Sequence, residues 1–224
     1  IKILRHFIGE QLSRAVGIYN KRLARLPYEE RRLRAREVWQ SETAHGYCQR
    51  AFKDPESRCS AYAYDAVHDL YGTLNRPLRV LELGCANASS YHCLQFRSID
   101  IETYCGIDIN ERMIEEAKGR YHGTRGLTFH CRDFFDHLKS ETDTYDILLV
   151  KQVFFHLDQD YLEAILDVLS EKRLVERIVF QEKVLKDHKA RESAIMNLGF
   201  SPITYSHNYD FCFCTLSSNF IRID

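Results

Sequence analysis

A glycine turn between an apolar run and a stretch of small residues is the first place where the chain is expected to do chemistry. Residues 79–89 read RVLELGCANAS, and the apolar run ends at Gly84. This pattern predicts a buried strand that turns tightly into a helix and leaves backbone N–H groups free. Such a turn suits a nucleoside-containing ligand. The binding residues predicted in this turn are Glu82, Gly84, Cys85, Ala86 and Asn87.

The turn lacks the residues that a phosphate-rich ligand requires. A dinucleotide site needs glycine at three positions, which here hold Gly84, Ala86 and Ser89. No Gly-Lys-Ser/Thr follows, so a P-loop is excluded. The carboxylate of Glu82 suits a ligand with a positive end better than a pyrophosphate. An ordinary strand–helix turn with small residues for packing is the alternative at this point.

Two acidic residues follow the next two predicted strands. Asp108 lies one βαβ unit after Glu82, where a carboxylate can accept both hydroxyls of a ribose. Asp133 comes just after the strand 127–131, where it can accept from the exocyclic amine of a base that Phe134 flanks. The alternative role for each Asp is to cap the helix that follows it.

Alternating strand and helix patterns place these residues in one fold. Strands are predicted over 79–83, 101–107, 127–131, 145–150 and 176–182, and helices over 58–74, 88–97, 111–121, 134–139, 160–172 and 187–198. The alternation predicts an α/β fold with a mostly parallel sheet and helices on both faces. Two last strands, 200–206 and 210–216, have only 207–209 between them and must form an antiparallel hairpin. The prediction is a seven-stranded sheet preceded by an N-terminal helical extension.

The predicted extension, residues 1–57, differs in charge from the ligand-binding domain over 58–224. Residues 1–40 carry ten Lys and Arg against four Glu, while the whole chain has a net charge of −1. The basic face at 21–37 fits a solvated helix, an anionic partner, or contact with a second subunit or neighbouring domain. The acidic remainder argues against broad binding of duplex nucleic acid.

Cysteine usage and hydropathy bear on location. The eight Cys form no C-x-x-C pair, so all are predicted to be reduced and the protein to be cytoplasmic. Cys212 and Cys214 lack two further evident ligands, so no metal site is predicted. No stretch approaches the ~20 apolar residues of a transmembrane helix, and no signal-peptide pattern opens the chain. The first residue is Ile1, which is compatible with a piece of a longer chain.

Read in order, the segments LELGCANAS, YCGIDINERM, CRDFF and YDILLVKQVFFHL resemble the class I methyltransferases that depend on S-adenosylmethionine. The resemblance covers roughly residues 60–216. It implies that Asp108 binds the ribose, that Asp133 contacts the adenine and that Met113 packs on it. Ala86 and Ala88 stand where the family often has Gly. The cofactor-binding residues predicted in full are Glu82, Gly84, Cys85, Ala86, Asn87, Asp108, Ile109, Met113, Asp133, Phe134, Lys151 and Gln152.

The resemblance implies methyl transfer to O or N of a small-molecule or saccharide-type acceptor. Alignment of an activated sulfonium donor with its acceptor does most of the work, and a base is needed only for a protonated nucleophile. His156 is the candidate base, with a structural His at a helix start as the alternative. Methylation of RNA or protein through the basic N-terminal helices and a non-catalytic cofactor-binding domain are the other functions considered. The missing second glycine opposes a nicotinamide-dependent oxidoreductase.

Overall fold

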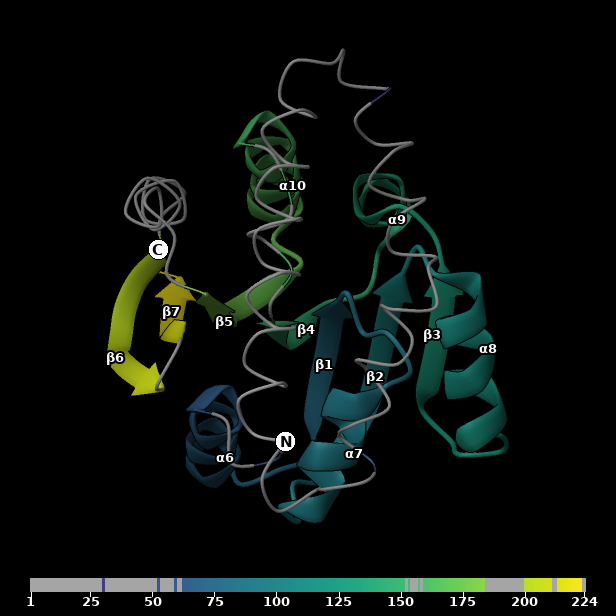
Figure 1. The fold of residues 1–224 in the computed structure, drawn as a ribbon, viewed down its shortest axis with the longest axis horizontal. Coiled ribbons are helices and arrows are strands. Elements are labelled where there is room, and N and C mark those ends of the chain that lie inside the picture. The colour runs from purple at the N-terminus through teal and green to yellow at the C-terminus, as the bar shows by residue number, and fades with distance from the viewer. Residues whose placement is uncertain are drawn as a thin grey trace, which may run out of the picture.

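A computed structural model describes residues 62–151, 159–183, 200–210 and 213–222, together with residues 30, 52, 59, 153 and 157. Figure 1 shows strands and helices that alternate along most of this part of the chain. The strands are β1 (Leu78–Leu83), β2 (Ile101–Asp108), β3 (Leu127–Cys131), β4 (Tyr145–Lys151), β5 (Val175–Lys183), β6 (Phe200–Asp210) and β7 (Phe213–Arg222). The helices are α6 (Tyr62–Leu74), α7 (Ser89–Phe96), α8 (Glu111–Arg120), α9 (Phe134–Ser140) and α10 (Gln159–Lys172).

The strands form one sheet in the order β3-β2-β1-β4-β5-β7-β6. Strands β1 to β5 pair in parallel, which confirms the predicted α/β fold with a parallel sheet. β7 pairs antiparallel with both β5 and β6. The strand order reverses at β1, which lies between β2 and β4. In open α/β sheets, ligands bind beyond the carboxyl ends of the strands at such a reversal.

Two apolar cores lie on the two faces of the sheet. Helices α6, α7 and α8 pack on one face and α9 and α10 on the other, as the elements in Figure 1 are arranged. The central strands β1 and β4 are buried along nearly their whole length. Their near-continuous apolar runs, LRVLEL and YDILLV, are what parallel strands covered on both faces require.

The observed hairpin differs from the predicted one in where its two strands begin and end. Residues 207–209, predicted to link the two strands, belong to β6 and pair with residues 214–216 of β7. The pairing continues as far as Asp210 and Phe213. β6 lies at one edge of the sheet. Edge strands often carry polar residues, which in the sequence alone resemble those of a turn. The predicted link at 207–209 is therefore wrong.

One cysteine prediction is also wrong. The sulfurs of Cys59 and Cys93 form a disulfide, with the two Cα atoms 4.8 Å apart. The predicted cytoplasmic location rested on reduced cysteines, so it stays a prediction without that support. None of the helices within the described part of the chain combines the length and apolar character that crossing a bilayer requires. The predicted helices of the N-terminal extension and the helix at 187–198 lie outside the described residues.

Candidate functional site

The turn after β1 adopts left-handed backbone angles at three positions. The φ angles are 75° at Gly84, 48° at Ala86 and 61° at Ala88. The N–H groups of Gly84 and Cys85 both donate to the carbonyl oxygen of Ile107, at 2.8 and 3.1 Å. These two bonds fasten the turn to the end of β2. Left-handed backbone angles are strained for residues with bulky or branched side chains, so the small side chains of Ala86 and Ala88 suit these two positions.

The same turn touches the segment that follows β4. A Cβ atom on Gly84 would lie 2.3 Å from the Cγ2 atom of Val153, which is closer than real Cβ atoms approach. Glycine is thus required at residue 84 both by its backbone angle and by this contact. The turn therefore lies at the point of the sheet where the strand order reverses.

Asp108, at the end of β2, joins two backbone turns. One of its carboxylate oxygens accepts from the N–H of Ala86 at 2.9 Å, and the other accepts from the N–H of Asn110 at 2.9 Å. Burial raises the pKa of Asp108, and the N–H groups of Asn110, Ala86 and Ile109 act in the opposite direction. Each carboxylate oxygen has a second lone pair, so both can also accept from a pair of hydroxyl groups. The predicted role for Asp108 is therefore compatible with its surroundings.

Asn87 provides a direct test of whether the turn fits a polar ligand. Its side chain is fully buried, and neither its amide nitrogen nor its carbonyl oxygen has a partner among the described residues. Unsatisfied buried polar atoms cost free energy and call for an explanation. A polar ligand at this turn would supply the missing partners. The residues present therefore fit a nucleoside-type cofactor at the carboxyl ends of β1 and β2.

Beneath the turn, Glu82 belongs to a buried hydrogen-bond network. The Tyr104 hydroxyl donates to Glu82, and Ser90 also hydrogen-bonds its carboxylate. The network extends to two further side chains. The Tyr64 hydroxyl donates to the Ser90 hydroxyl at 3.1 Å, and the Lys151 amine donates to the Tyr64 hydroxyl. Burial raises the pKa of Glu82 to about 7. Glu82 and Lys151, both predicted to bind the cofactor, are thus linked through the core.

The other predicted residues surround the same strand ends. Met113 is buried in the first part of α8, which begins after the cap residue Asn110, and Ile109 is half-buried between Asp108 and that cap. Cys85 is buried, and burial raises the pKa of its thiol well above its ordinary range. Its sulfur packs so close to Gly106 that a Cβ there would lie 2.8 Å away.

Asp133 caps α9 just beyond β3. Its carboxylate accepts from the N–H groups of Phe135 and Asp136, at 3.0 and 3.3 Å. Phe134 is buried in the core that α9 and α10 form against the sheet. The capping role of Asp133 is thus present, while its contact with adenine and that of Phe134 with a base stay predictions. Gln152 and His156 lie outside the described residues, so their roles stay predictions too.

Sequence reasoning missed the partners of these residues. Tyr104, Ser90 and Tyr64 hold the buried carboxylate of Glu82, yet each reads as ordinary in the sequence. A group of potential metal ligands, Cys105, His130 and His137, was missed as well. Alternation along β2 and β3 could have placed Cys105 and His130 on one face, but no local pattern brings His137 to them.

The fold and this site define an α/β protein with a nucleoside-type binding turn, and comparisons with known proteins add the family. Residues 74–207, more than half of the chain, match the family described as a methyltransferase domain. The chain belongs to this methyltransferase family. The predicted family is confirmed, and with it S-adenosylmethionine as the cofactor. No curated protein matches the chain.

Solved structures share the fold at low sequence identity. Magnesium protoporphyrin IX methyltransferase from Synechocystis PCC 6803, with bound S-adenosylmethionine, is 18% identical with a TM-score of 0.64, over 84% of this chain and 95% of that one. The N-methyltransferase NodS from Bradyrhizobium japonicum WM9, in complex with S-adenosylhomocysteine, is 14% identical with a TM-score of 0.57. That match covers 80% of this chain and 98% of NodS.

Proposed function

We propose that this chain transfers a methyl group from S-adenosylmethionine to an O or N atom of a small-molecule or saccharide-type acceptor. The observation that carries the proposal is the Asp108 carboxylate, which joins the turn after β1 to the start of α8. The buried and unpartnered Asn87 beside it supports a polar ligand. The cofactor supplies an activated methyl group on a sulfonium.

The chain's own residues position the reactants. The turn from Gly84 to Asn87 borders the cofactor. The N–H groups of Gly84, Cys85 and Ala86 are not free, contrary to the sequence-based expectation, because they bond Ile107 and Asp108 and so fix the shape of the turn. In this proposal Asp108 accepts the two ribose hydroxyls, and Met113 packs on the base. Because a sulfonium donor is already activated, alignment of the acceptor with the methyl group accounts for most of the rate. Lys151, the last residue of β4, and Gln152, which follows it, lie toward the acceptor in this proposal.

His156 acts as the general base when the acceptor is a hydroxyl. Its ordinary pKa range suits proton removal near neutral pH. Replacing His156 with Asn is expected to lower kcat by roughly 10²-fold or more and to remove the acidic limb of the pH dependence of kcat, because only the deprotonated imidazole can accept a proton. An unchanged kcat and pH profile would exclude this role, while leaving cofactor binding untouched.

Cofactor binding is tested by isothermal titration calorimetry with S-adenosylhomocysteine. Asp108→Asn loses one charged acceptor and is expected to weaken binding by roughly 10- to 100-fold, the scale of hydrogen bonds to a charged group. Asp69→Asn, on the exposed part of α6, is the matched control and should keep wild-type affinity. Wild-type affinity in Asp108→Asn, or no binding by the unmodified protein, would refute the proposal.

The domain organisation is part of the same proposal. Residues 1–57 form a helical extension or lid, and residues 58–224 form the methyltransferase domain with a seven-stranded sheet. The basic segment 21–37 offers a surface to an anionic partner, a second subunit or a neighbouring domain. RNA or protein as the acceptor is the alternative, and its support is this basic segment. Removal of residues 1–40 should then weaken polyanion binding and reduce its salt dependence, and an unchanged salt slope would count against it.

A further inference from the structure

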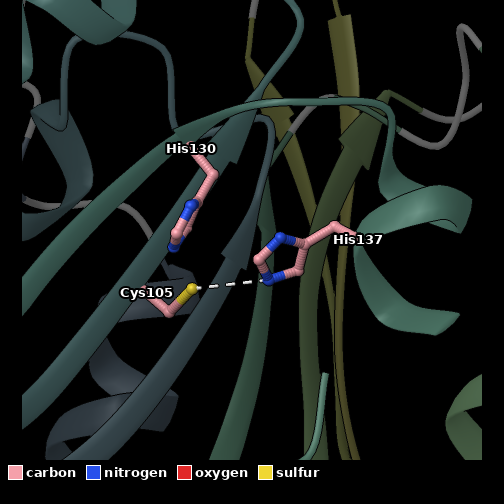
Figure 2. Close-up of side chains that lie close together, drawn as sticks. All are labelled: Cys105, His130 and His137. Atoms are coloured by element: carbon pink, nitrogen blue, oxygen red, sulfur yellow. Dashed lines mark hydrogen bonds between the residues drawn. The ribbon is translucent and has the colours of Figure 1, made fainter. Parts of the chain in front are cut away.

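Three side chains that are common metal ligands gather on the sheet face beneath α9. They are Cys105 from β2, His130 from β3 and His137 from α9, and Figure 2 shows the sulfur and the two rings turned toward one another. One ligand atom from each lies within 4.8 Å of those of the other two. Cys105 and His137 are buried, and His130 is half-buried.

Strand register brings two of these residues to the same face. His130 pairs with Ile107, which lies two residues after Cys105, and alternate residues of a strand point to one side. Cys105 and Ile107 pack in the core that includes Leu138 of α9. Cys85 of the cofactor turn packs in the other core, across the sheet. The group therefore lies on the opposite face of the sheet from the cofactor turn.

The spacing of the group fits one tetrahedral ion. Zinc binds sulfur at about 2.3 Å and imidazole nitrogen at about 2.0–2.1 Å, so two such ligands on one ion lie about 3.6 Å apart. The Cys105 sulfur lies 3.7 Å from the near edge of the His137 ring, at Nε2, so the thiol and the ring are already neighbours. The three ligand atoms lie within 4.8 Å of one another, so they must move by about 1 Å to reach bonding distance of a single ion. Side-chain rotation supplies movements of this size.

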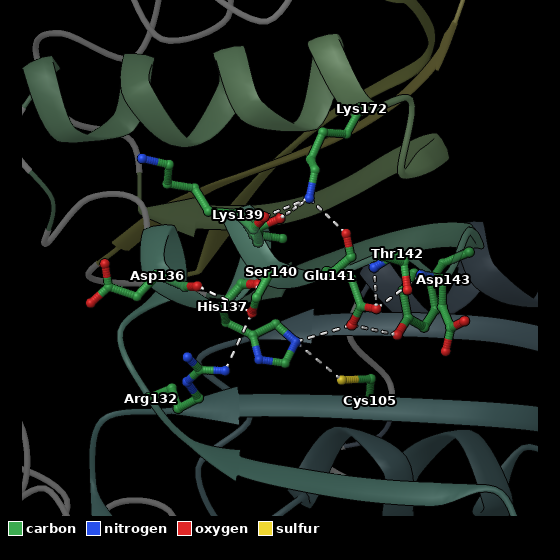
Figure 3. Close-up of polar contacts among 12 residues, drawn as sticks. Cys105, Arg132, Asp136, His137, Lys139, Ser140, Glu141, Thr142, Asp143 and Lys172 are labelled. Carbon is green, nitrogen blue, oxygen red and sulfur yellow. Dashed lines mark hydrogen bonds and ion pairs between the residues drawn. The ribbon is translucent and has the colours of Figure 1, made fainter.

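Glu141, next to the group, supplies a carboxylate of the kind that accompanies metal-bound histidines. Figure 3 shows the Glu141 carboxylate beside the ring of His137. Its Oε2 atom lies 3.1 Å from Nε2 of His137, and the Tyr145 hydroxyl donates to the same oxygen at 3.1 Å. The other carboxylate oxygen of Glu141 accepts from the N–H groups of Thr142 and Asp143, at 2.8 and 2.9 Å. The carboxylate is thus fixed in place.

The ring of His137 also has an unused nitrogen. Its Nδ1 atom is buried and has no hydrogen-bond partner among the described residues. Metal-bound histidines commonly bind the ion through one ring nitrogen and a carboxylate through the other. Because Nε2 of His137 contacts Glu141, Nδ1 is the nitrogen left for the ion. A thiolate at Cys105 and the carboxylate of Glu141 would together balance the charge of a divalent cation, which lowers the cost of placing that cation in the protein interior.

We propose that Cys105, His130 and His137 bind one zinc-class divalent cation, with Glu141 orienting His137. On binding, the Cys105 thiol releases its proton to solvent and a sulfur–metal bond forms, while each imidazole binds through one ring nitrogen. The ion would tie β2 and β3 to α9, whose first turn is capped by Asp133. Its role is therefore to stabilise the strand–helix turn next to the cofactor site, without contact with the reacting atoms.

The test is a metal titration of the full chain after treatment with a chelator. Cobalt(II) serves as a spectroscopic probe because a bound thiolate gives it a charge-transfer absorption, and zinc(II) is then added as a competitor. We expect about one cobalt(II) bound per chain, displaced by zinc(II). Cys105→Ser should remove the thiolate absorption. His130 is half-buried, so truncating it disturbs the core less than truncating the buried His137. His130→Ala should weaken cobalt(II) binding at least tenfold.

Matched controls separate this group from the other cysteines and histidines. Cys131→Ser, on the same strand as His130, and His122→Ala, at an exposed position, should keep both the absorption and the affinity. Glu141→Gln should keep the absorption but weaken binding 10- to 100-fold, as expected of a residue that orients a ligand. Circular dichroism checks that each variant is folded. Absence of cobalt and zinc uptake by the native protein, or an unchanged absorption in Cys105→Ser, would overturn the proposal.

Discussion

The buried carboxyl group of Glu82 makes the stability of the protein dependent on pH. Its side chain is 1% exposed, and burial raises its pKa to about 7, from the 4.5 of an unperturbed carboxyl group. The folded state therefore binds a proton that the unfolded state has already released over this pH range. Stability from this group is complete below about pH 4.5 and falls as the pH rises toward about 7.

The size of the effect follows from the shift itself. Each pKa unit corresponds to about 1.4 kcal/mol, so the ionisation of Glu82 lowers the free energy of unfolding by about 3 kcal/mol in total. Glu82→Gln keeps a side chain of the same shape and an oxygen that accepts from Tyr104, but it removes the titration. Relative to wild type, the free energy of unfolding of Glu82→Gln should thus rise by about 3 kcal/mol between pH 4.5 and pH 8.

Urea denaturation followed by far-UV circular dichroism, in the absence of cofactor, measures this difference at each pH. Other titrating groups are common to both proteins and cancel in the comparison. Tyr104→Phe provides a second variant, because the Tyr104 hydroxyl is one of the groups that lower the pKa of Glu82. Its loss should extend the decline to higher pH, because the pKa of Glu82 then rises further. A difference between Glu82→Gln and wild type that stays constant from pH 5 to pH 8 would refute the reasoning.

Three further predictions concern the turn, the helix cap and the disulfide. Gly84→Ala should lose roughly 1–2 kcal/mol of stability because residue 84 has a left-handed backbone, and it should also lose cofactor affinity because the new Cβ would meet Val153. Gly119→Ala is the control: no atom lies near its Cβ, so its stability, measured by urea denaturation, should rise by up to about 1 kcal/mol. Asp133→Ser keeps a capping oxygen and should preserve stability while weakening cofactor binding in calorimetry, and an unchanged affinity would remove Asp133 from the cofactor site. Cys93→Ser should lower the free energy of unfolding by about 3–4 kcal/mol, because the disulfide closes a loop with a sequence separation of 34, and a reductant should lower that of wild type equally but leave the variant unaffected.

Local patterns in the sequence were sufficient to predict the parallel part of the fold and the region of the cofactor turn. The strand and helix periods and the positions of Gly84, Asp108 and Asn110 are properties of short segments. Each strand before the hairpin was predicted to within a few residues of its observed bounds. The hairpin link failed because polar residues are typical both of turns and of edge strands, and only pairing with β7 distinguishes the two.

The sequence by itself thus determined which segments alternate as strand and helix and which of them end in a glycine or a carboxylate. The tertiary structure alone decided what those groups contact. The bond from Ala86 to Asp108 spans 22 residues, the one from Tyr104 to Glu82 also spans 22, and the Cys59–Cys93 pair spans 34. The meeting of Cys105, His130 and His137 depends on strand register and on how α9 docks. These contacts come from the packing of distant elements, and the free energy of that packing is not encoded in any local period of the chain.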